Sequence, residues 1–233
     1  AGPGLRSLFA QAGAGVVPGG PGRRCSTGEL LEAIRSTGSA EVILLPNDGD
    51  TIAVAEAAAQ AARDEGIRAA VIPTRAQVQG LAAVAVHDPA RSFDDDVVSM
   101  TSAAGHARHG AVTVAAKDAM TMAGPCRQGD SLGVVDGDFA VVGGDLDDVA
   151  IDVVTRLLSG GGEMVTLVTG AGAAGAATAD GDEPDGNLVG DAAVDLARLV
   201  DRVSTHVAAL RPDVEIVVYD GGQQRYPLLI GVE

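Results

Sequence analysis

The clearest pattern of apolar and polar positions lies in residues 42–51, with the sequence VILLPNDGDT. Four apolar residues, long enough for a buried strand and too short for a helix, precede Pro46, which cannot donate a hydrogen bond to a sheet. Asn47 and the acids after it are residue types that cap helices, and an Ala-rich helical stretch follows. Ligands of open α/β sheets bind at the carboxyl ends of strands. The pattern therefore predicts a strand, a tight turn and a helix, with any site of the first half near Asn47.

The rest of the first half repeats this alternation. A strand over 69–72 ends in Pro73 and Thr74, so a small polar side chain again follows a strand end. Ser26 precedes Glu29 at the capping-box spacing and is expected to begin a helix. Further helices are expected over 3–11, 51–65 and 77–86. Strands that alternate with helices predict a small doubly wound parallel sheet over residues 1–91.

The pattern changes in the second half. A polar stretch over 87–96 is interpreted as the join, and an acidic first turn begins a helix over 93–107. Asp136 and Gly137 form a favoured turn pair between two apolar runs, which predicts a β-hairpin. The remaining elements are helices over 145–158 and 187–210 and strands over 111–118, 164–168, 214–219 and 228–232. They indicate a mixed-sheet α/β domain over 92–233, with an acidic loop over 170–190.

Composition removes several classes of function. The chain has 233 residues, of which 46% are hydrophobic and 2% aromatic, so its core must be mainly aliphatic. A formal net charge of −16 excludes a general affinity for nucleic acid or for anionic membrane surfaces. No apolar run approaches the ~20 residues of a membrane span. The two cysteines lie far apart, which fits a reducing cytoplasm, and the abrupt helical start suggests a piece of a longer protein.

Two motifs, one rich in glycine and one rich in acidic residues, suggest a dinucleotide site and a calcium site, but each lacks residues that such a site requires. Residues 170–175 match GxGxxG after a strand, but the residues that follow offer no large apolar side chain for a packed helix. Residues 180–185 resemble a calcium loop, but Pro184 and Asp185 occupy the wrong positions. Lys117 is the only lysine and there is no phosphate-binding loop, so ATP binding by this chain alone is not expected. The histidines and cysteines have no recognised metal-ligand spacing.

Several segments, in one fixed order, carry a family resemblance. They are GLRSLFAQAGAGVVPGG, CSTGELLEAI, VILLPNDGDTIAVAEAAA, VIPTRAQVQGLAA and the closing VVYDGGQQRYPLLIGVE. Together they resemble the C-terminal region of the fatty acid kinase A subunit, which is a dihydroxyacetone-kinase-like bacterial protein whose C-terminal region is DegV-like. The resemblance covers nearly the whole chain.

The resemblance implies that different domains and subunits bind ATP, the metal and the fatty acid. ATP and a divalent metal would bind to domains upstream of this chain, and no cofactor is expected within it. A separate fatty-acid-binding subunit would present a fatty acid whose carboxylate becomes an acyl phosphate. This region would dock that subunit in the cytoplasm without being catalytic itself, and the full-length protein could form a homodimer. The matching motif loop consists of Gly221, Gly222, Gln223 and Tyr226.

Two other functions stay open beside docking. The polar side chains that follow the strand ends form a rim, which could bind a lipid or a hydroxyketone or could contact the partner subunit. The residues of this rim are Ser26, Thr27, Asn47, Thr74 and Gln79. These side chains could equally cap helices and satisfy loop backbone, and the Ala-rich helices favour a filled core. A hydrolase would need a nucleophile beside a base, for which the sequence gives no sign.

Overall fold

The computed structural model describes residues 2–19, 25–171 and 195–233. The chain divides into two compact units. The first unit comprises Arg6–Ala107, and the second comprises Gly2–Leu5 together with Arg108–Glu233. Each unit is described by itself below. The predicted division after residue 91 differs from this one, since the helix that follows residue 91 packs within the first unit.

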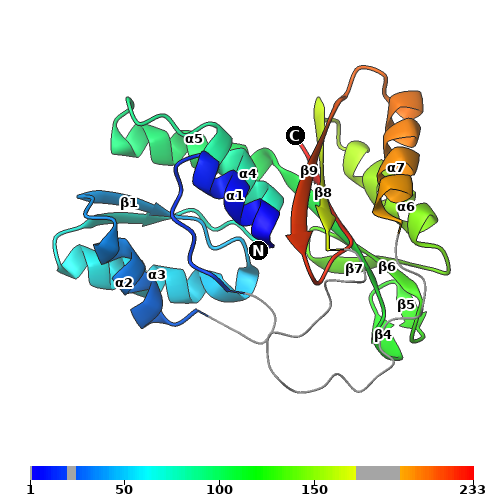
Figure 1. The fold of residues 1–233 in the computed structure, drawn as a ribbon, viewed down its shortest axis with the longest axis horizontal. Coiled ribbons are helices and arrows are strands. Elements are labelled where there is room, and N and C mark those ends of the chain that lie inside the picture. The colour runs from blue at the N-terminus through cyan, green and yellow to red at the C-terminus, as the bar shows by residue number, and fades with distance from the viewer. Residues whose placement is uncertain (1, 20–24, 172–194) are drawn as a thin grey trace. The chain divides into compact units, whose positions relative to one another are not determined.

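The first unit is a small layered α/β structure. Its elements are α1 (Pro3–Gln11, which begins in the second unit), α2 (Thr27–Ser36), β1 (Glu41–Leu44), η1 (Gly49–Thr51), α3 (Ile52–Asp64), β2 (Arg68–Val71), α4 (Gln77–Ala85) and α5 (Phe93–His106). The two strands pair in parallel, with Val42 opposite Ala69. Figure 1 shows α2 and α3 on one side of β1, and α4 and α5 on the other.

Alternation along β1 explains the layers. Val42 and Leu44 pack against α2 and α3, whereas Ile43 and Leu45 pack against α4 and α5. Four alanines of α3 are at most 1% exposed, so small side chains let this helix lie close to the sheet; they are Ala55, Ala58, Ala59 and Ala62. The expected doubly wound arrangement is confirmed, with helices on both faces of a two-stranded parallel sheet.

The second unit contains the larger sheet. Its elements are β3 (Arg108–Val114), β4 (Ala119–Thr121), β5 (Gly124–Cys126), β6 (Ser131–Val135), β7 (Asp138–Gly143), α6 (Leu146–Leu158), β8 (Met164–Gly170), α7 (Leu196–Leu210), β9 (Glu215–Gln223) and β10 (Leu228–Val232). The strand order is β7-β6-β3-β10-β8-β9. β8 and β9 run parallel and the other neighbouring pairs run antiparallel, which confirms the mixed sheet.

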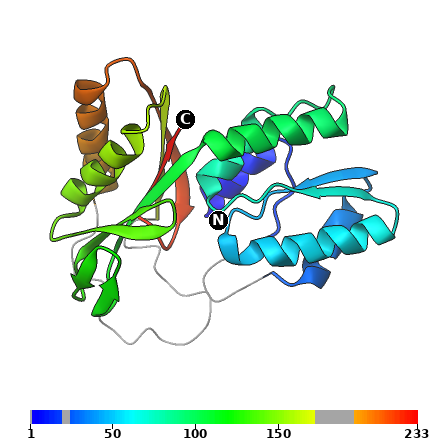
Figure 2. The same ribbon diagram turned by 180° about the vertical axis from the view of Figure 1, so that it is seen from behind.

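Helices α6 and α7 cover one face of this sheet (Figures 1 and 2). Their apolar residues join those of the strands in one aliphatic core, in which Val153, Leu199 and Val203 are fully buried. The close approach of α6 requires glycine in the strands. A Cβ on Gly133 would lie 2.5 Å from Val153 Cγ2, and one on Gly110 would lie 2.6 Å from Val153 Cγ1. No helix in the described ranges is long and apolar enough to span a membrane.

The sequence predicted one of the two hairpins described below and not the other. The β6–β7 turn is confirmed: Asp136 and Gly137 have φ values of 50° and 98°, the left-handed pair that a two-residue hairpin turn needs. The β4–β5 hairpin was not expected, since strands of three residues are too short to show alternation. Residues 172–190 of the acidic loop, most of the GxGxxG motif and the start of the predicted 187–210 helix lie outside the described residues.

Candidate functional site

The predicted rim has its centre where β1 and β2 end. The backbone N–H of Asn47 donates a hydrogen bond to Thr74 Oγ1 at 2.9 Å, across 27 positions of sequence. Thr74 is 1% exposed, so its hydroxyl lies inside the unit. Parallel strands end at the same edge of a sheet, which is why these two residues meet. The structure therefore brings Asn47 and Thr74 together, as the strand endings indicated.

Asn47 has an unusual backbone and an unsatisfied side chain. Its φ is 58°, in the left-handed region that asparagine tolerates better than most residues. Its side chain lies against α4, where a Cβ on Gly80 would come within 2.1 Å of Asn47 Oδ1. Within the described ranges, Asn47 Oδ1 is buried and has no hydrogen-bond partner. A buried acceptor of this kind is rare in native proteins and marks a place where a donor would bind favourably.

Gln79 has a structural role that the sequence did not reveal. Its Oε1 accepts a hydrogen bond from the Arg75 backbone N–H at 2.8 Å. Its Nε2 donates to the carbonyl oxygens of Ala104 at 3.3 Å and Ala107 at 3.1 Å. Gln79 thus ties the start of α4 to the end of α5, and its amide is used within the unit.

Ser26 and Thr27 lie at the start of α2. Ser26 Oγ accepts from the Glu29 N–H at 3.2 Å, and the Glu29 carboxylate accepts from the Ser26 N–H at 2.8 Å, so the predicted capping box is confirmed. Thr27 is the first residue of the helix and is half-buried. The hydrogen bonds of Ser26 in the described part of the chain stay within this helix terminus.

The motif residues form the end of β9 and the turn that leads to β10 in the second unit. Gln223 is 5% exposed, and its Nε2 donates to the carbonyl oxygens of Val168 at 3.0 Å and Tyr226 at 3.1 Å. A Cβ on Gly221 would lie 2.3 Å from Gln223 Oε1, and Gly222 has a φ of 62°. The loop thus joins β9 to β10 over the end of β8 in a form that only glycines permit.

The N-terminal residues pack on the same loop. A Cβ on Gly2 would lie 2.1 Å from the Gly222 carbonyl carbon, and one on Gly4 would lie 1.9 Å from the Asp220 carbonyl oxygen. Gly2–Leu5 therefore belongs with the second unit. The closing motif and the opening residues, at opposite ends of the sequence, form one packed structure.

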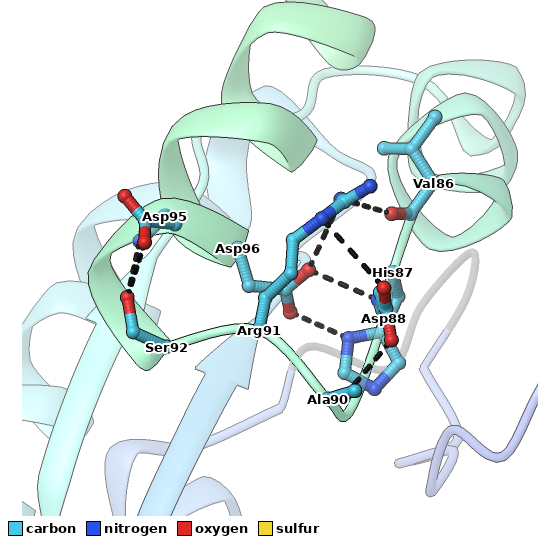
Figure 3. Close-up of polar contacts among 8 residues, drawn as sticks. All are labelled: Val86, His87, Asp88, Ala90, Arg91, Ser92, Asp95 and Asp96. Carbon is cyan, nitrogen blue, oxygen red and sulfur yellow. Dashed lines mark hydrogen bonds and ion pairs between the residues drawn. The ribbon is translucent and has the colours of Figure 1, made fainter.

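A polar cluster that the sequence analysis missed lies between α4 and α5 (Figure 3). His87 Nδ1 lies 2.6 Å from Asp96 Oδ2, and the Asp88 N–H donates to Asp96 Oδ1 at 3.1 Å. Arg91 Nη1 donates to the Val86 carbonyl at 2.9 Å and lies 3.9 Å from Asp96 Oδ1. Asp96 is 4% exposed, so one buried carboxylate organises the turn between the helices.

The electrostatics of this cluster favour an ionised Asp96. Burial by itself would raise the pKa of Asp96, but the hydrogen bonds from Asp88 and His87 and the charge of Arg91 outweigh burial and hold this pKa below its usual value. A sequence signal was present: Asp96 shares the buried face of α5 with Met100 and Ala104, four and eight positions later. Periodicity could thus have separated Asp96 from its exposed neighbour Asp95.

The described residues offer little other chemistry. Among residues 2–19, 25–171 and 195–233, no group of three or more His, Cys, Asp or Glu side chains could hold a metal ion. A depression of about 520 Å³ lies on the outer face of α5. It is lined by Val86, Arg91, Val98, Ser99, Ser102, Ala103 and His106, and no residue of the predicted rim contributes to it.

The comparisons with known proteins agree with this architecture. The family model for the C-terminal region of proteins like the fatty acid kinase A subunit matches residues 1–233. The chain belongs to this family. An uncharacterized protein of Staphylococcus haemolyticus is 25% identical over all 233 residues of the chain, which spans only 38% of that relative. A protein of Staphylococcus aureus strain bovine RF122 is 23% identical over the same lengths.

Solved structures share the fold of this family member at low identity. The fatty acid kinase B3 protein of Streptococcus pneumoniae, loaded with linoleic acid, is 12% identical with a TM-score of 0.60 over 90% of this chain and 76% of that one. A fatty-acid-binding DegV family protein of Thermus thermophilus is 12% identical with a TM-score of 0.54, over 98% of this chain and 84% of that one. The dihydroxyacetone kinase of C. freundii is 15% identical with a TM-score of 0.59, over 89% of this chain and 41% of that one. The expected DegV-like fold is confirmed.

Proposed function

We propose that this chain is the docking region of a fatty acid kinase. It binds a separate fatty-acid-binding subunit, whose bound fatty acid is phosphorylated to an acyl phosphate by ATP-binding and metal-binding domains elsewhere in the intact protein. The supporting observation is the family match over residues 1–233, combined with a rim whose polar groups are largely used internally. Such a chain keeps the DegV-like fold and contributes no catalytic residue, and it works in the cytoplasm.

The internal use of most rim groups favours docking over ligand binding. Gln79 makes hydrogen bonds through both of its amide atoms, and the Thr74 hydroxyl accepts from the Asn47 backbone. Ser26 caps its own helix. Side chains held in this way support a rigid surface, which keeps the entropic cost of binding a protein low.

A titration of the intact protein with the fatty-acid-binding subunit of the same organism tests the proposal. We expect saturable binding that is lost when the residues of this chain are deleted, with ATP binding by the remainder as the control for its folding. If the deleted protein bound the partner with unchanged affinity, the proposal would be overturned. Light scattering of the intact protein alone tests the expected homodimer separately.

The buried Asn47 Oδ1 supports a second candidate function. An unpaired acceptor beside the Thr74 hydroxyl could receive a hydrogen bond from the hydroxyl of a hydroxyketone or from a protonated lipid carboxyl group. Oleate and dihydroxyacetone, titrated separately into the intact protein, serve as probes. This candidate requires saturable binding that the Asn47→Gly variant loses, since glycine keeps the left-handed backbone while removing the amide. Absence of saturable binding by either probe excludes it.

A further inference from the structure

The β4–β5 hairpin presents the most exposed large apolar side chains of the described residues. Met120 is 79% exposed on β4, and Met122 is 87% exposed in the turn that follows. Figures 1 and 2 show the hairpin projecting from one end of the second unit. Methionine is flexible and polarisable, and it is frequent at surfaces that bind other proteins. Two such side chains on a short hairpin form a compact apolar tip.

A buried apolar cluster and a hydrogen bond across the turn fix the conformation of the hairpin. Cys126 on β5 is 3% exposed and belongs to a small apolar cluster with Ala115 and Leu132 of the second unit. Thr121 Oγ1 donates to the Gly124 carbonyl at 2.7 Å, closing the turn, and Gly124 has a φ of 117° that favours glycine. The tip is therefore ordered before it meets a partner, which lowers the entropic cost of docking.

The charges at the base of the hairpin differ from those of the chain as a whole. Lys117 precedes β4 and Arg127 follows β5; both are exposed, and neither makes an ion pair with another described residue. Asp118 and Asp130 lie nearby, and each accepts a backbone N–H, from Gln128 and Arg127 respectively. In a chain of net charge −16, the hairpin thus offers two cations beside an apolar tip.

We infer that the β4–β5 hairpin inserts Met120 and Met122 into an apolar recess edged by carboxylates on a partner protein. The inference rests on the proposed function for the identity of that partner, which is the fatty-acid-binding subunit. Lys117 and Arg127 pair with the acidic edge and orient the approach. An anionic lipid surface would be repelled by the net charge of −16.

A second copy of this chain fits the hairpin less well than a different partner does. In a twofold contact between hairpins, the acidic groups of this region that the cations could meet are Asp118 and Asp130 of the other copy, which already accept the backbone N–H groups of Gln128 and Arg127. Both copies would also carry the net charge of −16. Electrostatic complementarity therefore favours a partner with its own acidic edge over self-association.

The test compares variants of the intact protein in binding to the fatty-acid-binding subunit. Met120→Asp combined with Met122→Asp is expected to weaken affinity at least about tenfold, the equivalent of about 1.4 kcal/mol. Lys117→Glu combined with Arg127→Glu should reduce the association rate and its dependence on salt. Val98→Asp is the matched control, since Val98 is 68% exposed on α5 of the first unit. The substituted side chains are exposed, so thermal unfolding should be unchanged.

Each result decides a different claim. No binding by the unsubstituted protein overturns the proposed function itself. Binding that both methionine substitutions leave unchanged overturns only the hairpin inference, as does an equal loss in Val98→Asp. A shift in oligomeric state on methionine substitution, with no change in affinity for the partner, would assign the hairpin to self-association and also overturn the inference.

Discussion

The backbone N–H of Asn47 donates to the hydroxyl of Thr74 at 2.9 Å, and this bond joins the loops that follow the two strands of the first unit. Both loops begin with a proline directly after an apolar run, at Pro46 and Pro73. The bond extends the link between these two chain segments beyond the β1–β2 pairing itself. The rim is thus a fixed part of the fold, whatever it binds.

Removal of the Thr74 hydroxyl should destabilise the first unit. Thr74→Val keeps the shape of the side chain but leaves the Asn47 N–H without its acceptor, so we expect a loss of about 1–3 kcal/mol in the free energy of unfolding. Urea denaturation followed by circular dichroism measures it. Thr74→Ser, which retains the hydroxyl, should recover most of the loss, and equal losses in the two variants would contradict the role of the bond.

Asp96 should make the free energy of unfolding of the first unit decrease at low pH. Its pKa is lowered in the folded state, so the folded protein holds its proton less tightly than the unfolded chain does. The stabilisation is complete above the ordinary pKa of an unfolded aspartate, about 3.9, and is lost as the pH falls through the lower folded value. Urea midpoints measured from pH 7 to pH 3 test this.

The Asp96→Asn variant is the control for that profile. At neutral pH the substitution should cost about 1–2 kcal/mol, because the hydrogen bonds to His87 and to the Asp88 backbone lose their charged acceptor. The acid-dependent part assigned to Asp96 should then be absent. An Asp95→Asn variant, at an exposed position on the same helix, should retain it. Identical profiles for all three proteins would contradict the assignment.

Gly133 should not tolerate a side chain. The Cβ of Gly133→Ala would lie 2.5 Å from Val153 Cγ2 and 3.0 Å from Val141 Cβ, so we expect overpacking to cost about 1–3 kcal/mol. Gly144→Ala, where nothing lies within 4 Å of the added atom, is the matched control. Combination of Gly133→Ala with Val153→Ala should cost less than the sum of the two single losses in thermal unfolding; strict additivity would show that α6 does not set the limit.

Gly80 should be needed for the position of the Asn47 side chain. The added methyl of Gly80→Ala would lie 2.1 Å from Asn47 Oδ1, and the side chain must move or the helix must shift. Denaturation should show a loss of about 1–3 kcal/mol, which Asn47→Gly in the same protein should largely relieve.

Gly105→Ala provides the comparison. Gly105 lies in α5 with open space around the added atom, so this change should be neutral or stabilising by roughly 0.5–1 kcal/mol. A Gly80→Ala protein as stable as the Gly105→Ala protein would show that the Asn47 side chain moves freely.

Local chemistry alone determined a large part of this fold. The capping box of Ser26 and Glu29 and the turn of Asp136 and Gly137 act over a few residues, so the sequence located them well. Alternation placed β1 and β2 and their polar endings, because burial on a sheet face leaves a regular mark. The order of the motifs supplied the family, and with it the DegV-like fold.

Tertiary structure alone decided how the polar side chains are used. Gln79 reaches carbonyls 25 and 28 positions away, and Gln223 reaches one 55 positions away, so no local pattern could show that their amides are internal. Asp96 and His87 pair because two helices pack there, and the β4–β5 hairpin buries Cys126 in a cluster with Ala115 and Leu132. Whether a polar group faces a ligand or the protein depends on which distant atoms surround it, and only the folded chain determines that.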